Sequence, residues 1–223
     1  MKKLFVILFA SVLISVGEPI EAVPLQDLFD GAVIVADDKL FFGWTLINLV
    51  ATDPALDPDL GLIEVIPLED QPLNPGIRFE TNGQLVVTDQ NFLDLHFGFL
   101  VVALAPGHLI KDNSLEILEF TFGGPGGVIT IIEDVFDPAG NLLADKLVQA
   151  DQRLGIFDLF DSAQFTPQQA ISVEKNILIA GDFPGDRVSL DSFEQRFSQV
   201  AGPSTLVLVA LGLAGIWAVR RRG

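Results

Sequence analysis

The stretch that decides the fold is NFLDLHFGFLVV, residues 91–102. The odd-numbered positions from 93 to 101 carry Leu, Leu, Phe, Phe and Val, whereas Asp, His and Gly occupy positions 94, 96 and 98. A period of two is typical of a β-strand that has one buried face and one polar face. The stretch therefore predicts a half-buried strand.

Segments with strand character recur along the chain at short intervals. They lie at residues 32–36, 39–50, 62–68, 76–79, 84–87, 115–122, 128–136, 142–149, 171–181 and 187–197. Many short strands separated by turns indicate an antiparallel β-sandwich or jelly roll. We expect a single all-β domain over residues 23–198, with at most one short helix within residues 151–164.

Turn residues separate these segments. Asn82-Gly83 is the strongest hairpin signal, because both residues tolerate positive φ. Glycine, proline and aspartate also mark three further turns, GGPGG (123–127), DPAGN (137–141) and DFPGD (182–186). Within residues 115–122 the apolar phase shifts between Ile117 and Leu118, which predicts a β-bulge.

Both ends of the chain differ from this body. Lys2 and Lys3 precede an apolar run at 4–16, which predicts a secretory signal peptide over residues 1–22, cleaved after Ala22. The C-terminal run from Thr205 to Val219 has 15 residues without charge. As a helix it would span roughly 22 Å, against about 30 Å for a bilayer core. We expect a short C-terminal transmembrane helix within residues 199–223.

The body is strongly acidic. The chain carries 13 basic and 30 acidic residues, of which five basic and two acidic residues lie in the two end segments. Residues 23–200 therefore hold 8 basic and 28 acidic residues, a net charge of −20. Such a charge repels nucleic acid, so we expect no nucleic-acid partner. There is no cysteine, so no disulfide can cross-link the fold.

Catalytic signals are few. The two histidines, His96 and His108, are far apart and are interpreted as packing or surface residues. No catalytic motif is present, and Trp44 is expected in the core. Glu116 and Glu119 are the candidates for the paired carboxylates of a glycosidase, provided that the bulge brings them to one face. We predict no enzymatic activity and no organic cofactor.

Calcium is the one metal ligand that the sequence suggests. Asp53, Asp57 and Asp59 share the loop ATDPALDPDLG, and clustered carboxylates with loop carbonyls can bind calcium. Asp182 and Asp186 in GDFPGD form a second candidate. The alternative is that both loops are solvated acidic surface.

The C-terminal segment resembles a PEP-CTERM sorting signal, which exosortase systems of Gram-negative bacteria recognise. Pro203-Ser204-Thr205 is similar to the end of the family's motif, the apolar run to its helix, and Arg220, Arg221 and Arg222 to its arginine cluster. Ala201 and Gly202 stand where the family has Pro and Glu. The positive-inside rule places the arginines in the cytoplasm.

The resemblance implies a protein of the cell surface or extracellular matrix, associated in that family with exopolysaccharide and biofilm. It implies transient anchoring in the inner membrane by the C-terminal helix and processing by an exosortase-type enzyme. We therefore expect an exported, non-enzymatic surface or matrix protein. The alternative is a secreted carbohydrate-binding or glycoside-hydrolysing jelly-roll protein.

Overall fold

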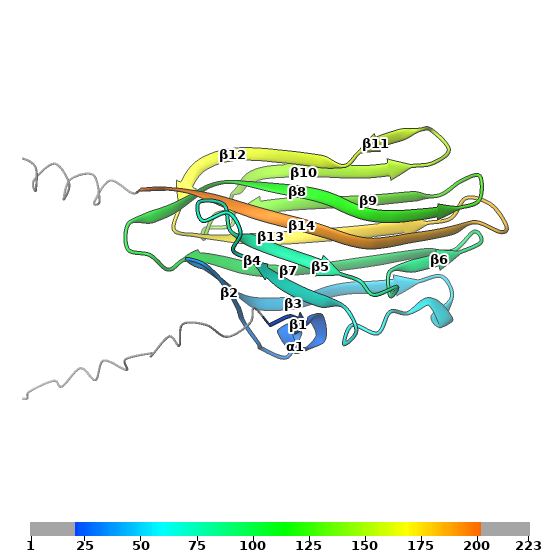
Figure 1. Ribbon diagram of the computed structural model, residues 1–223, viewed down its shortest axis with the longest axis horizontal. Coiled ribbons are helices and arrows are strands. Elements are labelled where there is room, and N and C mark those ends of the chain that lie inside the picture. The colour runs from blue at the N-terminus through cyan, green and yellow to red at the C-terminus, as the bar shows by residue number, and fades with distance from the viewer. Residues whose placement is uncertain (1–20, 202–223) are drawn as a thin grey trace, which may run out of the picture.

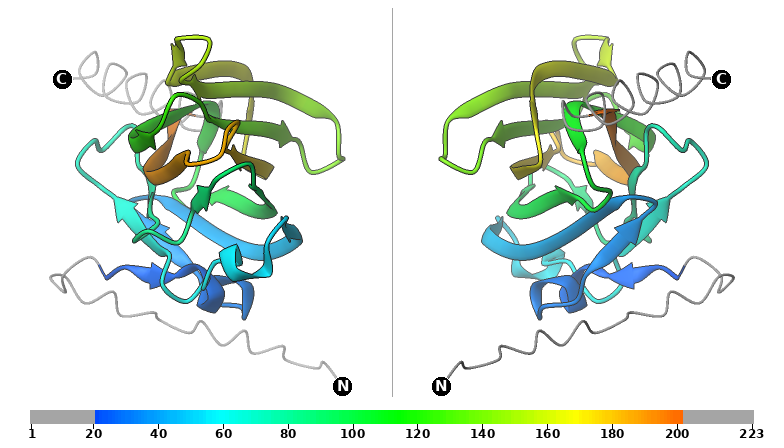
Figure 2. Two further views of the ribbon diagram at one scale, coloured as in Figure 1. Left: turned by 90° about the vertical axis from the view of Figure 1, so that its right-hand side faces the viewer. Right: turned by 90° about the vertical axis from the view of Figure 1, so that its left-hand side faces the viewer.

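The computed structural model describes residues 21–201, which form two seven-stranded β-sheets that face each other (Figure 1). Every strand pairing in both sheets is antiparallel. Figure 2 shows the two layers end-on, with the helix α1 (Leu25–Phe29) at one side. The prediction of an all-β antiparallel sandwich is confirmed.

We call the two layers sheet I and sheet II. In spatial order, sheet I contains β1 (Val23–Pro24), β4 (Glu64–Leu68), β5 (Gly76–Glu80), β14 (Arg187–Ala201), β8 (His108–Gly123) and β12 (Phe160–Gln168), and β6 (Val86–Thr88) also pairs with β14. Sheet II contains β11 (Ile156–Asp158), β10 (Leu142–Asp151), β9 (Val128–Phe136), β13 (Ala170–Ala180), β7 (Phe92–Ala103), β3 (Lys39–Ala51) and β2 (Ile34–Ala36).

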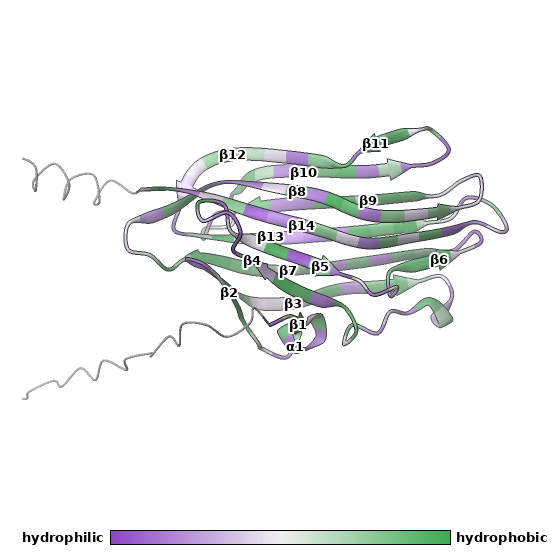
Figure 3. Ribbon diagram, viewed as in Figure 1, coloured by the Kyte–Doolittle hydropathy of each residue, from purple (hydrophilic) through white to green (hydrophobic). Residues whose placement is uncertain are grey.

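The stretch at 91–102 forms most of β7 and behaves as its alternation predicts. Its five apolar residues at the odd positions 93–101 are at most 2% exposed and face the inside of the sandwich. Hydrophobic and hydrophilic residues alternate along most strands of both sheets (Figure 3). Burial of these apolar faces against each other is the main driving force for the two-layer fold.

Aromatic rings occupy the centre of the core. Trp44 is 5% exposed and stacks on Phe99 with 4.4 Å between ring centroids, so its predicted core position is confirmed. Phe79 of sheet I and Phe193 on the neighbouring strand also stack, at 4.4 Å and an interplanar angle of 9°. Each buried ring contributes about 1.5–3 kcal/mol through removal of its surface from water.

The predicted turns form, but one joins two strands of the same sheet and two join strands of different sheets. Residues 137–141 join β9 to β10, which pair as a hairpin, and Asp137 Oδ1 accepts hydrogen bonds from the amides of Ala139 and Asn141. Residues 123–127 instead lead from β8 in sheet I to β9 in sheet II. Residues 182–186 lead from β13 in sheet II to β14 in sheet I. These two turns connect the layers.

The hairpin predicted at Asn82-Gly83 is wrong, although the turn itself exists. Both residues have positive φ, 50° and 75°, and the amide of Gln84 bonds the carbonyl of Thr81. The flanking strands β5 and β6 do not pair with each other, because both run antiparallel to β14 along the same edge. β14 is long enough to pair with both strands, one after the other along its length. The turn at Asn82-Gly83 therefore connects two successive partners of β14 and closes no hairpin.

The bulge predicted in β8 is confirmed. Along β14, Ser192 pairs with Glu119 and Phe193 pairs with Ile117, so Leu118 is the extra residue. A second irregularity on β14 leaves Asp191 without a partner in the ladder. The shift in phase lets Ile117 before the bulge and Phe120 after it both contact the core.

The short helix predicted within residues 151–164 is wrong. Residues 156–158 extend sheet II as β11, and residues 160–168 extend sheet I as β12, because each finds an unpaired edge strand beside it. Among residues 21–201 the helices are α1 and the 3-10 helix η1 (Pro54–Leu56), which lies in the acidic loop. In this part of the chain no helix has the length and apolarity needed to cross a membrane. The predicted signal peptide and transmembrane helix lie almost entirely outside the described residues.

Candidate functional site

A groove of about 610 Å³ lies on the outer face of sheet I. It is lined by β8, β12 and β14, together with the loop before β5. Because successive side chains of a strand point to opposite faces, every second residue of these strands reaches the groove. The outward side chains that line it include Ser114 and Glu116 of β8, Phe160 and Ser162 of β12, and Glu194 and Arg196 of β14.

The strand register sets neighbours within the groove. Glu116 on β8 lies between Phe160 on β12 and Glu194 on β14. In the next row, Ser114 lies between Ser162 and Arg196. The groove therefore combines carboxylates, hydroxyls and a guanidinium on one rigid sheet surface.

An ionic network forms one wall. Arg196 is 7% exposed, and its Nε donates to Glu194 Oε1 at 2.8 Å while its Nη1 donates to Asp70 Oδ1 at 2.9 Å. Arg78 Nη2 donates to the other oxygen of Glu194 at 3.0 Å. The hydrogen bond from Arg196 lowers the pKa of Asp70. Burial alone would lower the pKa of Arg196, but hydrogen bonds to Asp70 and Glu194 raise it. The wall is therefore a fixed, charged surface.

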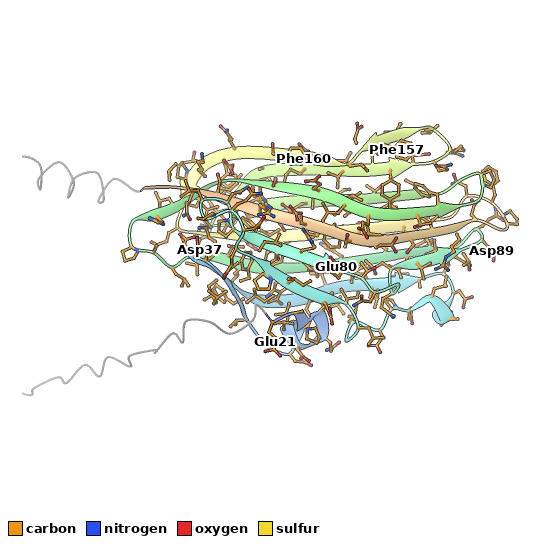
Figure 4. All side chains as sticks on the ribbon, in the orientation of Figure 1. Glu21, Asp37, Glu80, Asp89, Phe157 and Phe160 are labelled. Atoms are coloured by element: carbon orange, nitrogen blue, oxygen red, sulfur yellow. The ribbon has the colours of Figure 1, made fainter. Side chains whose placement is uncertain are left out.

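An exposed aromatic ring forms the opposite wall. Phe160 on β12 is 58% exposed. Figure 4 labels it beside Phe157, which lies on β11 and is also exposed but does not line the groove. Exposed aromatic residues next to polar groups are typical of surfaces that bind ligands.

The bulge leaves Glu116 and Glu119 on the same face of sheet I. Glu119 is exposed and pairs with Ser192, the residue beside Glu80 on β5. Burial raises the pKa of Glu80, and the negative charge of Glu119 raises it further. Glu116 lies in the groove, and the carboxylate nearest to it in the ladder, Glu194, is bound by two arginines.

The calcium candidates Asp53, Asp57 and Asp59 are all exposed in the loop after β3. The carboxylates of Asp53 and Asp59 accept hydrogen bonds from nearby backbone amides, those of Ala55 and Gly61. Within residues 21–201 no three His, Cys, Asp or Glu side chains gather as metal ligands would. Calcium binding by this loop stays a prediction.

Asp182 and Asp186 organise the connections between the sheets. Asp186 is 2% exposed, and its Oδ2 accepts from the amides of Asp182 (3.0 Å) and Phe183 (2.8 Å). Its Oδ1 accepts from Gly126 in the other turn at 3.2 Å. A Cβ at Gly124 would lie 2.3 Å from this oxygen, so only glycine allows the approach. The carboxylate ties the two turns together.

The histidines lie apart. His96 is on the outer face of sheet II, with Nε2 3.9 Å from Glu174. His108 Nδ1 lies 2.9 Å from Asp38 Oδ2. A second hollow, of about 550 Å³ and more apolar, lies on the outer face of sheet II beside Phe42, Leu100 and Phe136.

The sorting residues lie at the boundary of the described structure. Ala201 ends β14, and Gly202, Pro203, Ser204 and Arg220 to Arg222 lie outside the described residues. Residues 203–222 match the family model of the PEP-CTERM protein-sorting motif. The C-terminal segment is therefore similar to this sorting motif. A motif of this kind indicates an exported protein, and the match begins at Pro203, after the two positions where the family's Pro and Glu are missing.

The β-sandwich has distant likenesses among solved structures. One is a structure from work on promiscuous carbohydrate-binding modules of the β-sandwich superfamily, at 7% identity and TM-score 0.27, with 74% of this chain and 58% of that chain covered. TmCBM61 in complex with β-1,4-galactotriose has 12% identity and TM-score 0.27, with 71% and 88% covered. The CBM22-1–GH10 modules of Clostridium thermocellum xylanase 10B with xylohexaose have 14% identity and TM-score 0.23, with 74% and 27% covered. No curated protein matches the sequence.

Sequence reasoning missed the groove as a site. Its strands contribute residues 112–116, 160–164 and 194–198, and these segments are 44 and 30 positions apart in the sequence (116 to 160 and 164 to 194). The alternation marks Ser114, Glu116 and Arg196 as outward residues, but strand order is needed to bring them together. No local signal in the sequence gives that order.

Proposed function

We propose that this protein is an exported, non-enzymatic β-sandwich that its C-terminal sorting motif directs to the cell surface or extracellular matrix. The observation that carries the proposal is the match of residues 203–222 to the PEP-CTERM sorting motif. The charge of residues 23–200 also supports the proposal. A net charge of −20 favours solubility and repels anionic lipid headgroups, which suits a domain located outside the membrane.

The sorting segment acts in this proposal as a transient anchor in the inner membrane. The apolar run holds the chain there, and Arg220 to Arg222 stay in the cytoplasm because arginines resist translocation. An exosortase-type enzyme then processes the chain near Pro203. Mature protein on the cell surface or in the matrix lacks the arginine cluster.

Fractionation of cells tests this function. Mass spectrometry of the chain from membrane, surface and medium fixes both termini, including the predicted start at Val23. Replacement of all three arginines by glutamine should release or mislocalise the chain, whereas replacement by lysine should preserve sorting as a matched control for charge. Protein in the medium that retains Arg220 to Arg222 contradicts the proposal.

A second candidate function is binding of an exopolysaccharide in the groove of sheet I. The observation that favours it is the combination of the exposed Phe160 ring with Glu116, Ser114 and Arg196 on one rigid surface. A sugar ring can place its apolar face on the phenyl ring while its hydroxyls bond the polar side chains.

Affinity electrophoresis of the full chain through gels that contain the organism's own exopolysaccharide tests this second function. Phe160→Ala should abolish any retardation, because it removes the apolar wall of the groove. Phe157→Ala is the matched control, since this exposed ring lies outside the groove, and it should leave retardation unchanged. Equal migration of the wild-type chain with and without polysaccharide contradicts glycan binding.

A further inference from the structure

Four polar side chains are buried between the two sheets. Asn113 comes from β8 of sheet I, and Glu133, Lys146 and Lys175 come from β9, β10 and β13 of sheet II. All four are at most 2% exposed. Charged groups are rarely buried to this extent unless they are paired, so the arrangement calls for a chemical account.

Register and hydrogen bonds bring these groups together. Glu133 is the direct ladder partner of both Lys146 and Lys175, so all three side chains point inward in one row. Lys146 Nζ donates to Asn113 Oδ1 at 2.7 Å, and Asn113 Nδ2 donates to Glu133 Oε1 at 2.6 Å. The same Oε1 lies 2.9 Å from Lys146 Nζ. One carboxylate oxygen thus contacts both the amine and the amide nitrogen.

Lys175 occupies a different position. It binds the other carboxylate oxygen, Oε2, and its ammonium lies over the ring of Phe193 at 5.7 Å from the centroid. It makes no hydrogen bond to Asn113 within the described part of the chain. Of the two lysines, Lys146 is therefore the one placed against the amide.

The charges favour a reactive amine. One carboxylate cannot neutralise two ammonium groups at a buried site, and burial lowers the pKa of Lys175 despite the attraction of Glu133. Burial alone would raise the pKa of Glu133, but the two lysines lower it. Desolvation and a nearby second cation favour the neutral amine of lysines in general, and the geometry, in which Lys146 Nζ lies against the amide of Asn113, selects the nucleophile.

We propose that Lys146 and Asn113 form an intramolecular isopeptide bond, with Glu133 as the catalytic proton carrier. The C=O bond of the amide is about 1.2 Å long, so the observed hydrogen bond places Nζ within about 3.9 Å of the carbonyl carbon. That distance is close to the separation of reacting atoms in near-attack geometry, about 3–3.5 Å.

The reaction balances without a further reactant. Glu133 takes a proton from the Lys146 ammonium, and the free amine attacks Cγ of Asn113 to form a C–N bond. Glu133 then returns the proton, with the second amine proton, to Nδ2 as the Cγ–Nδ2 bond breaks. The products are a secondary amide and an ammonium ion, because the two protons from the amine join the two already on Nδ2, and Glu133 is restored as a carboxylate.

The bond would join the two layers of the sandwich. Asn113 belongs to sheet I and Lys146 to sheet II, and 33 positions separate them in the sequence. A covalent link of this kind constrains the unfolded chain as a disulfide does. The chain has no cysteine, so an isopeptide bond is the cross-link that its residues can supply.

Mass spectrometry of the purified full chain tests the proposal. Loss of ammonia lowers the mass by about 17 Da relative to the sequence between the observed termini. Trypsin should leave residues 112–153 as one light peptide, because the linked Lys146 resists cleavage. Further digestion after glutamate should release residues 112–116 still joined to residues 134–153. A succinimide at Asn82 has the same mass effect but falls in the tryptic peptide 79–111, so mapping separates the two.

Variants assign the roles. Lys146→Arg and Glu133→Gln should each show the full sequence mass, whereas Lys175→Arg should keep the loss of about 17 Da, because it preserves the second cation and Lys175 does not touch Asn113. Asn113→Asp should instead lose water. Circular dichroism confirms that each variant is folded before its mass is compared.

A folded wild-type chain that shows its full mass and is cleaved at Lys146 overturns the proposal. The reverse pattern, in which the linkage survives Lys146→Arg and disappears with Lys175→Arg, overturns the assignment of the nucleophile. The wild-type measurement decides the existence of the bond even if a variant fails to fold.

Discussion

Removal of the Asp186 carboxylate should destabilise the sandwich without a change in its core. In Asp186→Ala, three backbone amides lose their acceptor, those of Asp182, Phe183 and Gly126. The substitution therefore separates the turn between β13 and β14 from the turn between β8 and β9. Both turns connect sheet I with sheet II, so the lost hydrogen bonds weaken the link between the two layers.

The magnitude follows from the burial of these amides. A hydrogen bond to a charged acceptor contributes about 1.5–3 kcal/mol, and an unsatisfied buried donor costs about 1–3 kcal/mol. Gly126 is buried, whereas Asp182 and Phe183 are partly exposed and can bond water after the substitution. We expect the free energy of unfolding to fall by about 3 kcal/mol, the larger share of it at Gly126.

Urea unfolding followed by circular dichroism measures this change. Asp182→Ala is the matched control, because this neighbouring carboxylate accepts one long hydrogen bond, from Gly127 at 3.4 Å, and its other contact in the described part of the chain is an ion pair with the exposed Arg153 at 3.6 Å. Both are weak, so the substitution should cost less than about 1 kcal/mol. Urea unfolding of both variants is measured with calcium and with chelator, because Asp182 and Asp186 are also the second pair of predicted calcium ligands. A loss below about 1 kcal/mol in Asp186→Ala would refute the reasoning and show that other contacts hold the two turns.

Three further outcomes are expected. Phe193→Ala should lower the free energy of unfolding by about 3–5 kcal/mol, because it leaves a cavity beside the stacked Phe79, and a loss below about 1.5 kcal/mol would show that the core collapses around it. While the groups at positions 146 and 175 are both cations, the pKa of Glu133 is lowered, so the stabilising contribution of its carboxylate is complete above its unfolded pKa, near 4.5, and is lost as pH falls through the lower folded value. In urea melts at successive pH values, acid should therefore destabilise Lys146→Arg, which keeps both cations and cannot form the isopeptide bond, more steeply than Lys146→Arg combined with Glu133→Gln, and an equal pH dependence of the two variants would contradict this reasoning. If the three aspartates of the acidic loop bind calcium, Tm should rise in millimolar calcium by the equivalent of about 2.7 kcal/mol at a hundredfold excess over Kd, and an unchanged Tm leaves them as solvated surface.

Most of the strands, the bulge and the sorting motif were predictable from the sequence, whereas β11 and β12 were not. Each of these depends on short-range order in the chain: side chains alternate across a strand, an extra residue breaks that alternation at Leu118, and residues 203–222 form one contiguous segment. The same alternation also held a signal that was not used. Glu133, Lys146 and Lys175 each stand on the apolar phase of a strand, between residues such as Ile131 and Val135, which marks them as buried charges.

Only the tertiary structure decided which strands are neighbours. Asn82 and Gly83 adopt the dihedral angles of a hairpin turn, yet β14 takes both flanking strands as partners because long-range pairing satisfies more backbone groups than the local hairpin would. Pairing between distant strands also assembled the groove around Glu116 and placed Asn113 against Lys146 from the opposite sheet. A strand records in its sequence which of its faces is buried, but the partner it pairs with depends on the packing of the whole chain.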